Sequence, residues 1–173
     1  IVDGRLLLAN AYFELKELSA ARLLLENLPD AGLSPERFWE KHYLLASVYL
    51  GEASLDRALG GATNLVQLAK GIADPEFAAR SVDFHGDVLR RMSQPDAAVA
   101  LYEQNLATNV PANWRRSALL KITDLYVAVN RLTNAVQRLE RLFIRHPGDP
   151  ATELAHMTLG ELRLRQFYGL PDA

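Results

Sequence analysis

Histidine is the side chain best suited to acid–base chemistry or metal binding near neutral pH. The sequence contains four: His42, His85, His146 and His156. Glu153 and His156 have the Glu-x-x-His spacing of helical di-iron sites, which places both side chains on one helix face. Those sites need a second copy of the motif and two further glutamates, and only one copy is present. We therefore expect a surface or groove histidine at position 156 and no metal site.

His85 lies between Asp83 and Asp87, but this spacing does not support catalysis. Residues two apart on a helix point to different faces, so neither carboxylate can orient the imidazole as a triad partner would. We expect His85 to be a packed histidine bonded to a neighbour. No Ser/His/Asp order and no paired catalytic carboxylates can be singled out, and the absence of cysteine excludes thiolate catalysis. The sequence predicts no enzyme, no catalytic residue and no cofactor.

Phosphate and nucleic-acid sites are also disfavoured. Gly60 and Gly61 lack the strand, lysine and spacing of a phosphate loop, so we interpret them as a point of close packing. The pairs Arg90-Arg91 and Arg115-Arg116 are diluted by nearby acidic residues and have no interleaved aromatic side chains. The chain carries 19 Lys and Arg against 21 Asp and Glu, a net charge of −2, whereas binding by counterion release favours a basic excess. We expect no nucleic-acid partner.

The composition predicts an all-α protein. Leucine and alanine supply 31 and 24 of the 173 residues, against 20 for isoleucine, valine and threonine together. Leucine and alanine keep most of their freedom in a helix, whereas β-branched side chains lose theirs. No run of 18 apolar residues occurs, so we expect no direct membrane insertion of this segment. The absence of cysteine excludes disulfides and cysteine zinc sites and leaves the compartment open.

An internal repeat gives these helices their order. Marker residues at intervals of 37, 40, 37 and 37 are Tyr12, Tyr49, Leu89, Tyr126 and Arg163. Small residues stand three positions earlier: Ala9, Ala46, Gly86, Thr123 and Gly160. Alanines stand nine positions after the first four markers: Ala21, Ala58, Ala98 and Ala135. Small residues suit places where helix backbones approach closely, so each unit is interpreted as two antiparallel amphipathic helices joined by a short turn.

Helix punctuation places nine helices. Ser34 and Asp74 each precede a proline and predict an N-cap with proline at the first helical position. The expected helices are 4–15, 19–29, 35–50, 54–70, 75–91, 95–108, 111–128, 131–145 and 150–168. No strand or low-complexity linker is expected, and 1–173 is predicted to be a single domain of stacked hairpins. Because the chain begins at Ile1 and enters a leucine run at once, we expect a fragment of a longer protein.

This repeat resembles that of the tetratricopeptide repeat family. The best match to the family pattern is the series Leu119, Ile122-Thr123, Tyr126, Ala135, Leu139, Leu142 and Pro147. The second unit supplies Leu45-Ala46, Tyr49 and Ala58. The resemblance covers about four and a half units and implies a right-handed superhelix of antiparallel helix pairs. The units are longer than the family's, so the turns between repeats should be longer, and His85, Leu89 and Asn105 make the third unit the least typical.

A narrower resemblance lies near the end of the chain. The segment 143–150, Phe-Ile-Arg-His-Pro-Gly-Asp-Pro, is similar to a turn of bacterial envelope tetratricopeptide proteins, namely the outer-membrane-assembly lipoprotein and the Tol–Pal coordinator. Those proteins are periplasmic scaffolds. The resemblance implies a bacterial protein of the periplasm or cell envelope, with the cytoplasm as the alternative.

The family resemblance also implies a concave groove lined by the first helix of each pair. By that register the groove residues are Asn10, Phe13, Glu14, Tyr43, Ser47, Arg80, Asp83, Asp87, Arg90, Arg91, Leu120, Asp124, Val127, Met157 and Glu161. An apolar and aromatic early part gives way to a charged middle, a mixture that suits an extended or helical peptide. We expect a non-enzymatic scaffold that binds a peptide or segment of another protein there.

Two further expectations concern partners. Family members that grip acidic chaperone tails use a clamp of Lys and Asn. Asn10 matches one such asparagine, but its equivalents include Asp87 and Asp124, whose carboxylates would repel an acidic tail. The alternative function is structural, in which apolar terminal helices associate with further repeats or with a second chain. The residues expected to form those terminal faces are Leu6, Leu7, Leu8, Leu159, Leu162 and Phe167.

Overall fold

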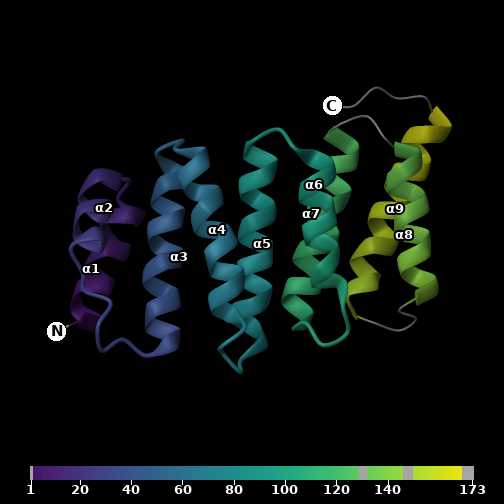
Figure 1. Cartoon of the computed structure of the whole chain (residues 1–173). Helices are drawn as coiled ribbons and strands as arrows, with labels where there is room; N and C mark the ends of the chain where they lie inside the picture. Colours follow the sequence, from purple (N-terminus) through teal and green to yellow (C-terminus); the bar gives the residue numbers. More distant parts are fainter. Residues whose placement is uncertain (1, 129–131, 146–149, 169–173) are drawn as a thin grey trace. The chain divides into compact units, whose positions relative to one another are not determined.

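The computed structural model describes residues 2–128, 132–145 and 150–168, and this part of the chain is helical without strands. The helices are α1 (Val2–Glu14), α2 (Leu18–Glu26), α3 (Pro35–Gly51), α4 (Leu55–Ala69), α5 (Pro75–Arg91), α6 (Pro95–Tyr102), η1, a 3-10 turn (Glu103–Leu106), α7 (Ala112–Ala128), α8 (Leu132–Arg145) and α9 (Pro150–Tyr168). The odd-numbered helices are the first, or A, helices of the repeat and the even-numbered ones are the B helices (Figure 1). The all-α prediction is confirmed.

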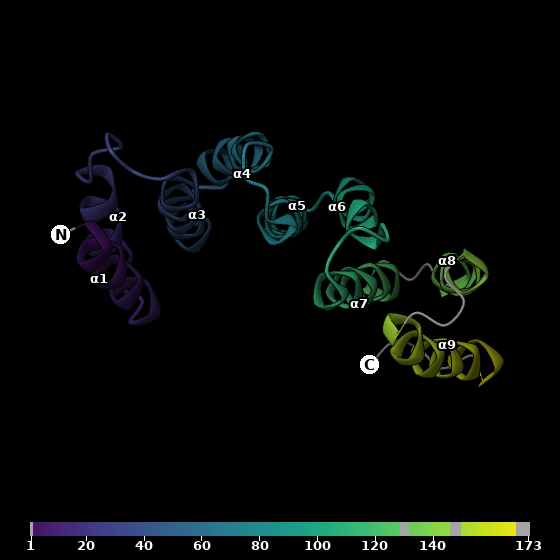
Figure 2. The same ribbon diagram turned by 90° about the horizontal axis from the view of Figure 1, so that it is seen from below.

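The chain divides into two compact units, Ile1–Gln94 and Pro95–Ala173. In the N-terminal unit α2 packs on α1 and α3, while α4 packs between α3 and α5 (Figure 2). In the C-terminal unit α7 contacts α6, α8 and α9, and α8 also contacts α9. Neighbouring helices are thus paired within each unit as the repeat predicts, and the single domain over 1–173 stays a prediction.

Local sequence explains where helices start. The Ser34 side chain accepts a hydrogen bond from the backbone N–H of Arg37, and Asp74 accepts one from Glu76. In both cases proline follows at the first helical position, so the two predicted N-caps are confirmed. These caps satisfy N–H groups that have no partner inside the helix.

The turn from an A helix to a B helix has the same form three times. It spans three residues and holds its middle one at positive φ: Lys16 (63°), Ala53 (57°) and Ser93 (59°). Beyond it, the next backbone N–H donates to the carbonyl of the marker residue five positions earlier, as in Glu17 to Tyr12 and Ser54 to Tyr49, both at 2.9 Å. This is a Schellman closure formed without glycine.

The register alanines occupy equivalent places. Ala21, Ala58, Ala98 and Ala135 are each the fourth residue of their helix, in α2, α4, α6 and α8. The first three are fully buried. Their A-helix counterparts Ala9, Ala46, Gly86 and Thr123 are buried as well, whereas Gly160 on α9 is exposed. The repeat predicted from spacing is therefore present in the structure.

The two adjacent glycines of α4 have different environments. A Cβ at Gly61 would lie 2.7 Å from the Cβ of Ala46, whereas a Cβ at Gly60 would meet nothing within 4 Å. Close packing of α3 on α4 therefore requires glycine only at position 61, and the prediction that both glycines mark close packing is wrong for Gly60.

A buried tryptophan links three helices of the N-terminal unit. Trp39 on α3 is fully buried, and its indole Nε1–H donates to the Ser81 hydroxyl on α5 at 2.9 Å. The Ser81 hydroxyl in turn donates to the carbonyl of Phe77 at 2.7 Å, with the carbonyl of Leu65 on α4 at 3.2 Å. Satisfied hydrogen bonds of this kind let polar groups be buried at low cost. Trp39 therefore serves packing between successive repeats.

The structure departs from the predicted helix ends at α2 and α6. Helix α2 ends at Glu26, before the predicted residue 29, where the Asn27 side chain donates to the carbonyl of Leu23 at 2.7 Å. Helix α6 ends at Tyr102 and continues as a 3-10 turn that contains buried Asn105. Asn105 is one of the residues that make the third unit atypical in sequence, and the B helix of that unit is irregular in the structure.

Replacing Gly61 with alanine should lower the free energy of unfolding by about 1–3 kcal/mol, because the new Cβ would push α4 away from Ala46. Gly60→Ala is the matched control. It adds a methyl group in open space and should raise the free energy by roughly 0.5–1 kcal/mol through helix propensity. Urea unfolding followed by circular dichroism measures both. Equal effects at the two positions would contradict the close approach of α3 and α4.

Ser81→Ala should lower the free energy of unfolding by about 1–3 kcal/mol, because the buried indole N–H of Trp39 would lose its acceptor. Ser47→Ala is the control for stability, since the Ser47 hydroxyl also donates to the carbonyl four residues earlier, at 2.8 Å, but accepts no hydrogen bond from another described residue. We expect a change within about 0.5 kcal/mol at Ser47. Chemical unfolding of the two variants would show similar losses if the Trp39 bond contributed nothing.

Candidate functional site

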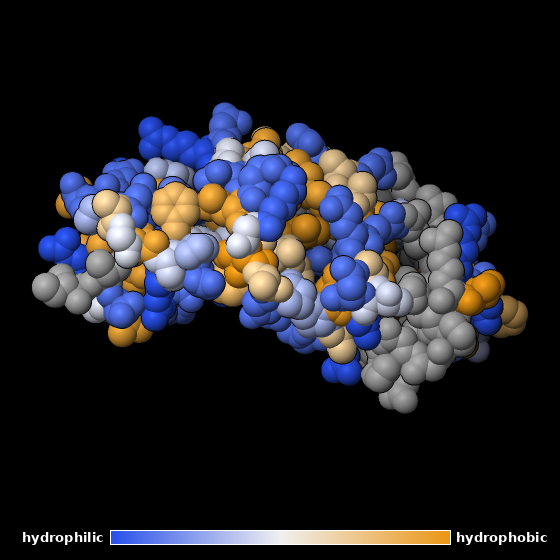
Figure 3. Space-filling model, turned by 60° about the horizontal axis from the view of Figure 1, so that its bottom comes forward, coloured by the Kyte–Doolittle hydropathy of each residue, from blue (hydrophilic) through white to orange (hydrophobic). Residues whose placement is uncertain are grey.

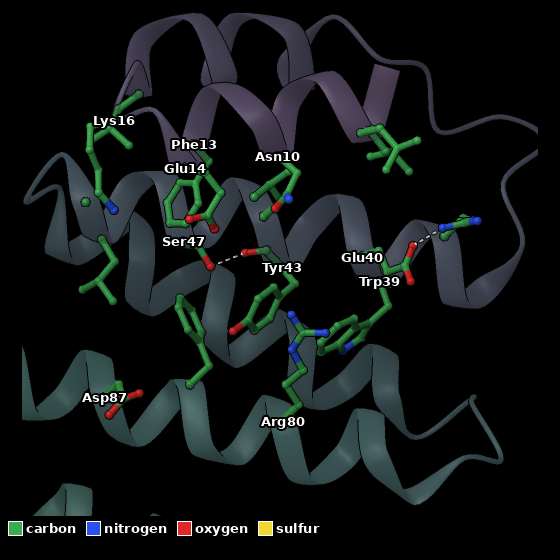
Figure 4. A pocket seen from close by; sticks show the side chains of 18 of the residues that line it. Asn10, Phe13, Glu14, Lys16, Trp39, Glu40, Tyr43, Ser47, Arg80 and Asp87 are labelled. Atoms are coloured by element: carbon green, nitrogen blue, oxygen red, sulfur yellow. Dashed lines mark hydrogen bonds and ion pairs between the residues drawn. The ribbon is translucent and has the colours of Figure 1, made fainter. Parts of the chain in front are cut away.

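An open groove with a volume of about 940 Å³ lies in the N-terminal unit. Most of its lining comes from α1, α3 and α5, the A helices of this unit, and the rest from Lys16 in the turn after α1 and from Leu18 at the start of α2 (Figure 4). The contacts between α3 and α5 run in the same order along both helices, with Trp39 against Phe77 and Tyr43 against Phe84. The two helices are therefore parallel, so matching positions of successive A helices face the same groove.

Aromatic rings form the middle of the groove. Trp39 and Tyr43 are four residues apart on α3 and stack with centroids 5.0 Å apart and an interplanar angle of 17°. The Phe77 and Trp39 rings form a T-shaped pair with centroids 4.9 Å apart, and Phe84 packs against Tyr43 at 5.2 Å. This packing fixes the Tyr43 ring, which is half-buried and lines the groove.

Arg80 of α5 lies over this aromatic shelf, which we define as the rings of Trp39 and Tyr43. Its guanidinium carbon is 4.0 Å from the Tyr43 centroid and 5.3 Å from that of Trp39. Both distances suit a cation–π interaction. Figure 4 shows the Arg80 side chain reaching from α5 toward the two rings of α3.

Ion pairs hold other charges at the two ends of the groove. Near the start of α3, Arg37 contacts Asp3 at 3.1 Å and Glu40 at 2.6 Å. Near the end of α5, Arg90 lies 3.6 Å from Asp87. Figure 3 shows hydrophobic side chains as separate patches among hydrophilic ones over the N-terminal unit. The groove thus offers apolar, cationic and anionic groups within one surface.

The sequence-predicted groove residues fall into three sets. Nine line the groove of the N-terminal unit: Asn10, Phe13, Glu14, Tyr43, Ser47, Arg80, Asp87, Arg90 and Arg91. Five lie on A helices of the C-terminal unit: Leu120, Asp124 and Val127 on α7, Met157 and Glu161 on α9. Asp83 does not line the groove. It is 7% exposed and lies one helical turn from buried Ala79 and Gly86, on the packed stripe of α5.

Several groove residues were not predicted. Glu40 lies about one turn and Arg37 almost two turns before Tyr43, the first predicted position on α3, and Leu6 and Leu44 contribute apolar side chains. A register extended toward the starts of the A helices would have included Arg37 and Glu40. Trp39 both packs between repeats and borders the groove, a double role that a single position in the repeat does not reveal.

The histidines offer little acid–base chemistry. Burial lowers the pKa of His85 below its usual value. Burial also lowers the pKa of His42, an effect opposed by the Asp30 carboxylate and reinforced by Lys41. His85 is half-buried and forms no hydrogen bond with another described residue, so its predicted bond to a neighbour is wrong. His156 is exposed, as predicted.

Other predicted features concern metals and membranes. His146 and the side chain of Glu153 lie outside the described residues. Within 2–128, 132–145 and 150–168, no three His, Cys, Asp or Glu side chains are grouped to hold a metal ion. In the same ranges no helix combines the length and apolar character that a membrane span requires.

Comparisons with known proteins agree with this architecture. No curated protein matches the chain. Solved structures do: TPR-like repeats of a Podosopora anserina protein described as a kinesin light chain match with a TM-score of 0.70 and 18% identity, over 97% of this chain and 87% of that one. BtubC (BKLC) from P. vanneervenii matches with a TM-score of 0.68 and 14% identity, over 97% and 73%. At these identities the likeness shows the fold alone.

A protein-family model provides the stronger result. The family described as the tetratricopeptide repeat-like domain matches residues 3–127, which is most of the chain. Its fold is generally a protein-interaction scaffold and is generally non-catalytic. Together with the repeat of paired helices and the groove lined by A helices, this match shows that the chain belongs to the tetratricopeptide repeat-like domain family.

Proposed function

We propose that the groove of the N-terminal unit binds a segment of another protein and that the chain acts as a non-enzymatic scaffold. The open groove carries this proposal, because half-buried Phe13 and Tyr43 stand beside exposed Asn10 and paired charges on one surface. Recognition of a peptide uses apolar anchors together with polar edges, and this lining supplies both.

The groove has the length for a short segment. Its lining on α3 extends from Arg37 to Gly51, which at a rise of ~1.5 Å per residue is about 21 Å. That length fits about six residues of an extended chain, at ~3.3 Å each, or about four turns of a helix. The proposed contact residues in this unit are Asn10, Phe13, Tyr43, Ser47, Arg80, Asp87 and Arg90.

Other predictions extend beyond the groove. Contacts of a partner with Asp124, Met157 and Glu161 stay predictions for the C-terminal unit. The bacterial envelope assignment is also a prediction, and it depends on the segment 143–150, of which 146–149 lie outside the described residues. Labelling of the protein in fractionated cells would test it.

Self-association is a second candidate, favoured by large exposed apolar side chains. Leu7 and Leu8 on α1 are 71% and 46% exposed, and Phe167 on α9 is 82% exposed. The predicted terminal faces are smaller than expected, because the remaining three members are buried within their units: Leu6, Leu159 and Leu162. Their burial results from packing of α1 and α9 on neighbouring helices of the same unit.

Selection from a library of displayed 15-residue peptides tests the groove. We expect peptides that bind the wild type and lose at least tenfold in affinity with Asn10→Trp, because the indole would fill part of the groove. Asn64→Trp is the matched control, since Asn64 is exposed on α4 and does not line the groove. Fluorescence anisotropy measures each affinity. Recovery of no peptide, or only of peptides indifferent to Asn10→Trp, would count against the proposal.

Sedimentation velocity at several concentrations tests self-association. If the apolar ends pair, the wild type should sediment as a concentration-dependent mixture, and Leu8→Glu or Phe167→Glu should shift it to monomer, because a buried carboxylate without a partner is costly. Thr63→Glu, at an exposed position of α4, is the control. A wild-type monomer throughout the micromolar range would remove this candidate.

A further inference from the structure

We propose that the groove selects a partner segment carrying one acidic side chain beside an apolar one, and that Arg80 binds this carboxylate on the aromatic shelf. The inference rests on the proposed function, because it assigns the chemistry of the segment that occupies the same groove. Its basis is the balance of charges inside the groove and the way the Arg80 guanidinium is held.

Arg80 has a ring partner but no ion pair. Its guanidinium lies over Tyr43 and Trp39, and among the described residues no carboxylate pairs with it. Stacking uses the face of the guanidinium, whereas its N–H donors lie in the plane and point outward at the edge. A carboxylate can therefore form two parallel hydrogen bonds with Arg80 while the stack is kept.

The remaining charges of the groove leave an excess of cations. Arg37 is neutralised by Asp3 and Glu40, and Arg90 lies beside Asp87. The lining cations without an ion pair to any described residue are Arg80, Lys16 and Arg91. Among the lining carboxylates, Glu14 likewise has no ion pair to any described residue. Over the whole described lining, five cations stand against four carboxylates, two of which share Arg37, and this small excess favours a segment with a single negative charge.

The position of Arg80 indicates a side-chain carboxylate and not a chain end. Its ring partners, residues 39 and 43, lie inside the stretch of α3 that lines the groove, which begins at Arg37 and continues to Gly51. A segment lying in the groove would therefore pass Arg80 and continue on both sides. Half-buried Phe13 and Leu50 lie farther along the lining and offer a contact for a neighbouring apolar side chain.

Acidic groups of the groove limit the charge of the segment. Glu14, Glu40 and Asp87 also line it, and each would repel a further carboxylate placed nearby. A strongly acidic tail is therefore disfavoured, whereas one carboxylate directed at Arg80 gains the charge-assisted bonds without meeting these groups. The apolar neighbour supplies the rest of the affinity through burial against half-buried Phe13 and Leu50.

The test uses the 15-residue peptides recovered by display that are sensitive to Asn10→Trp. Each is synthesised in its original form, with its Asp or Glu replaced by Asn or Gln, and with an amidated C-terminus. We expect neutralisation of one acidic side chain to weaken binding to the wild-type chain about tenfold, the size typical of a charge-assisted hydrogen bond in a partly desolvated site. Amidation should have little effect.

Variants of the protein identify the receiving residue. With Arg80→Met, the acidic peptide and its neutral version should bind with affinities within about threefold, because the coupled partner is gone. Arg80→Lys should keep part of the difference. Arg57→Met is the matched control, since the Arg57 guanidinium lies 5.5 Å from the Tyr49 ring outside the groove, and it should leave the tenfold difference unchanged. Circular dichroism verifies that each variant is folded.

The outcomes separate this inference from the proposed function. Peptides that are sensitive to Asn10→Trp but indifferent to neutralisation would overturn the carboxylate inference and leave peptide binding in place. A loss caused by amidation alone would also overturn it, in favour of a chain end. If Arg80→Met does not fold, a neutral peptide that binds the wild type as well as its acidic parent still contradicts the inference. Recovery of no groove peptide would remove both proposals.

Discussion

The hydrogen bond between the Trp39 indole and the Ser81 hydroxyl is the contact on which the N-terminal groove depends. It joins α3 to α5, and the serine reaches α4 through the carbonyl of Leu65. The indole held in this way supports the Tyr43 ring by stacking, and that ring in turn lies under the Arg80 guanidinium. A buried bond between repeats is therefore connected, through two rings, to the half-buried Arg80 cation that lines the groove. Stability and recognition share the same residues here.

Close backbone approach is the second requirement of this unit. The absence of a side chain at Gly61 allows α4 to lie against Ala46 of α3, and α4 fills the space between α3 and α5. With α4 in this position, the side chains of α3 and α5 that face away from it can line the groove. Small residues at helix contacts and large ones in the groove are thus two consequences of one packing arrangement.

Spacing in the sequence was enough to predict the helix pairs, because packing imposes it. Ala21, Ala58 and Ala98 must be small wherever a B helix meets its neighbours, and their intervals therefore record the repeat. The starts of α3 and α5 were equally predictable from the sequence, since Ser34 and Asp74 accept cap hydrogen bonds from residues only two or three positions away. The early end of α6 was not, because it depends on the burial of Asn105 in the folded unit.

Repeat position predicted which residues line the groove, but not how their side chains contact one another. Tyr43 and Arg80 were placed correctly from repeat position, whereas their stacking required the parallel arrangement of α3 and α5. Asp83 is equivalent to Tyr43 by spacing, and yet it is buried. Repeat position indicates only approximately on which face of a helix a residue lies. A rotation of the helix by a fraction of a turn decides whether that side chain faces solvent or a neighbouring helix.

The left-handed residues between paired helices have a consequence for how such repeats diversify. Lys16, Ala53 and Ser93 adopt nearly the same positive φ although a cationic, an apolar and a hydroxyl side chain are involved, and all three are exposed. These turns keep the left-handed conformation without a glycine, so packing of the paired helices must hold it in place. The side chain at the middle position, the tip of the turn, is therefore free to vary. At Lys16 that freedom brings a cation to the groove margin. Mutation at these tips can thus retune a recognition surface while the scaffold beneath it is inherited unchanged.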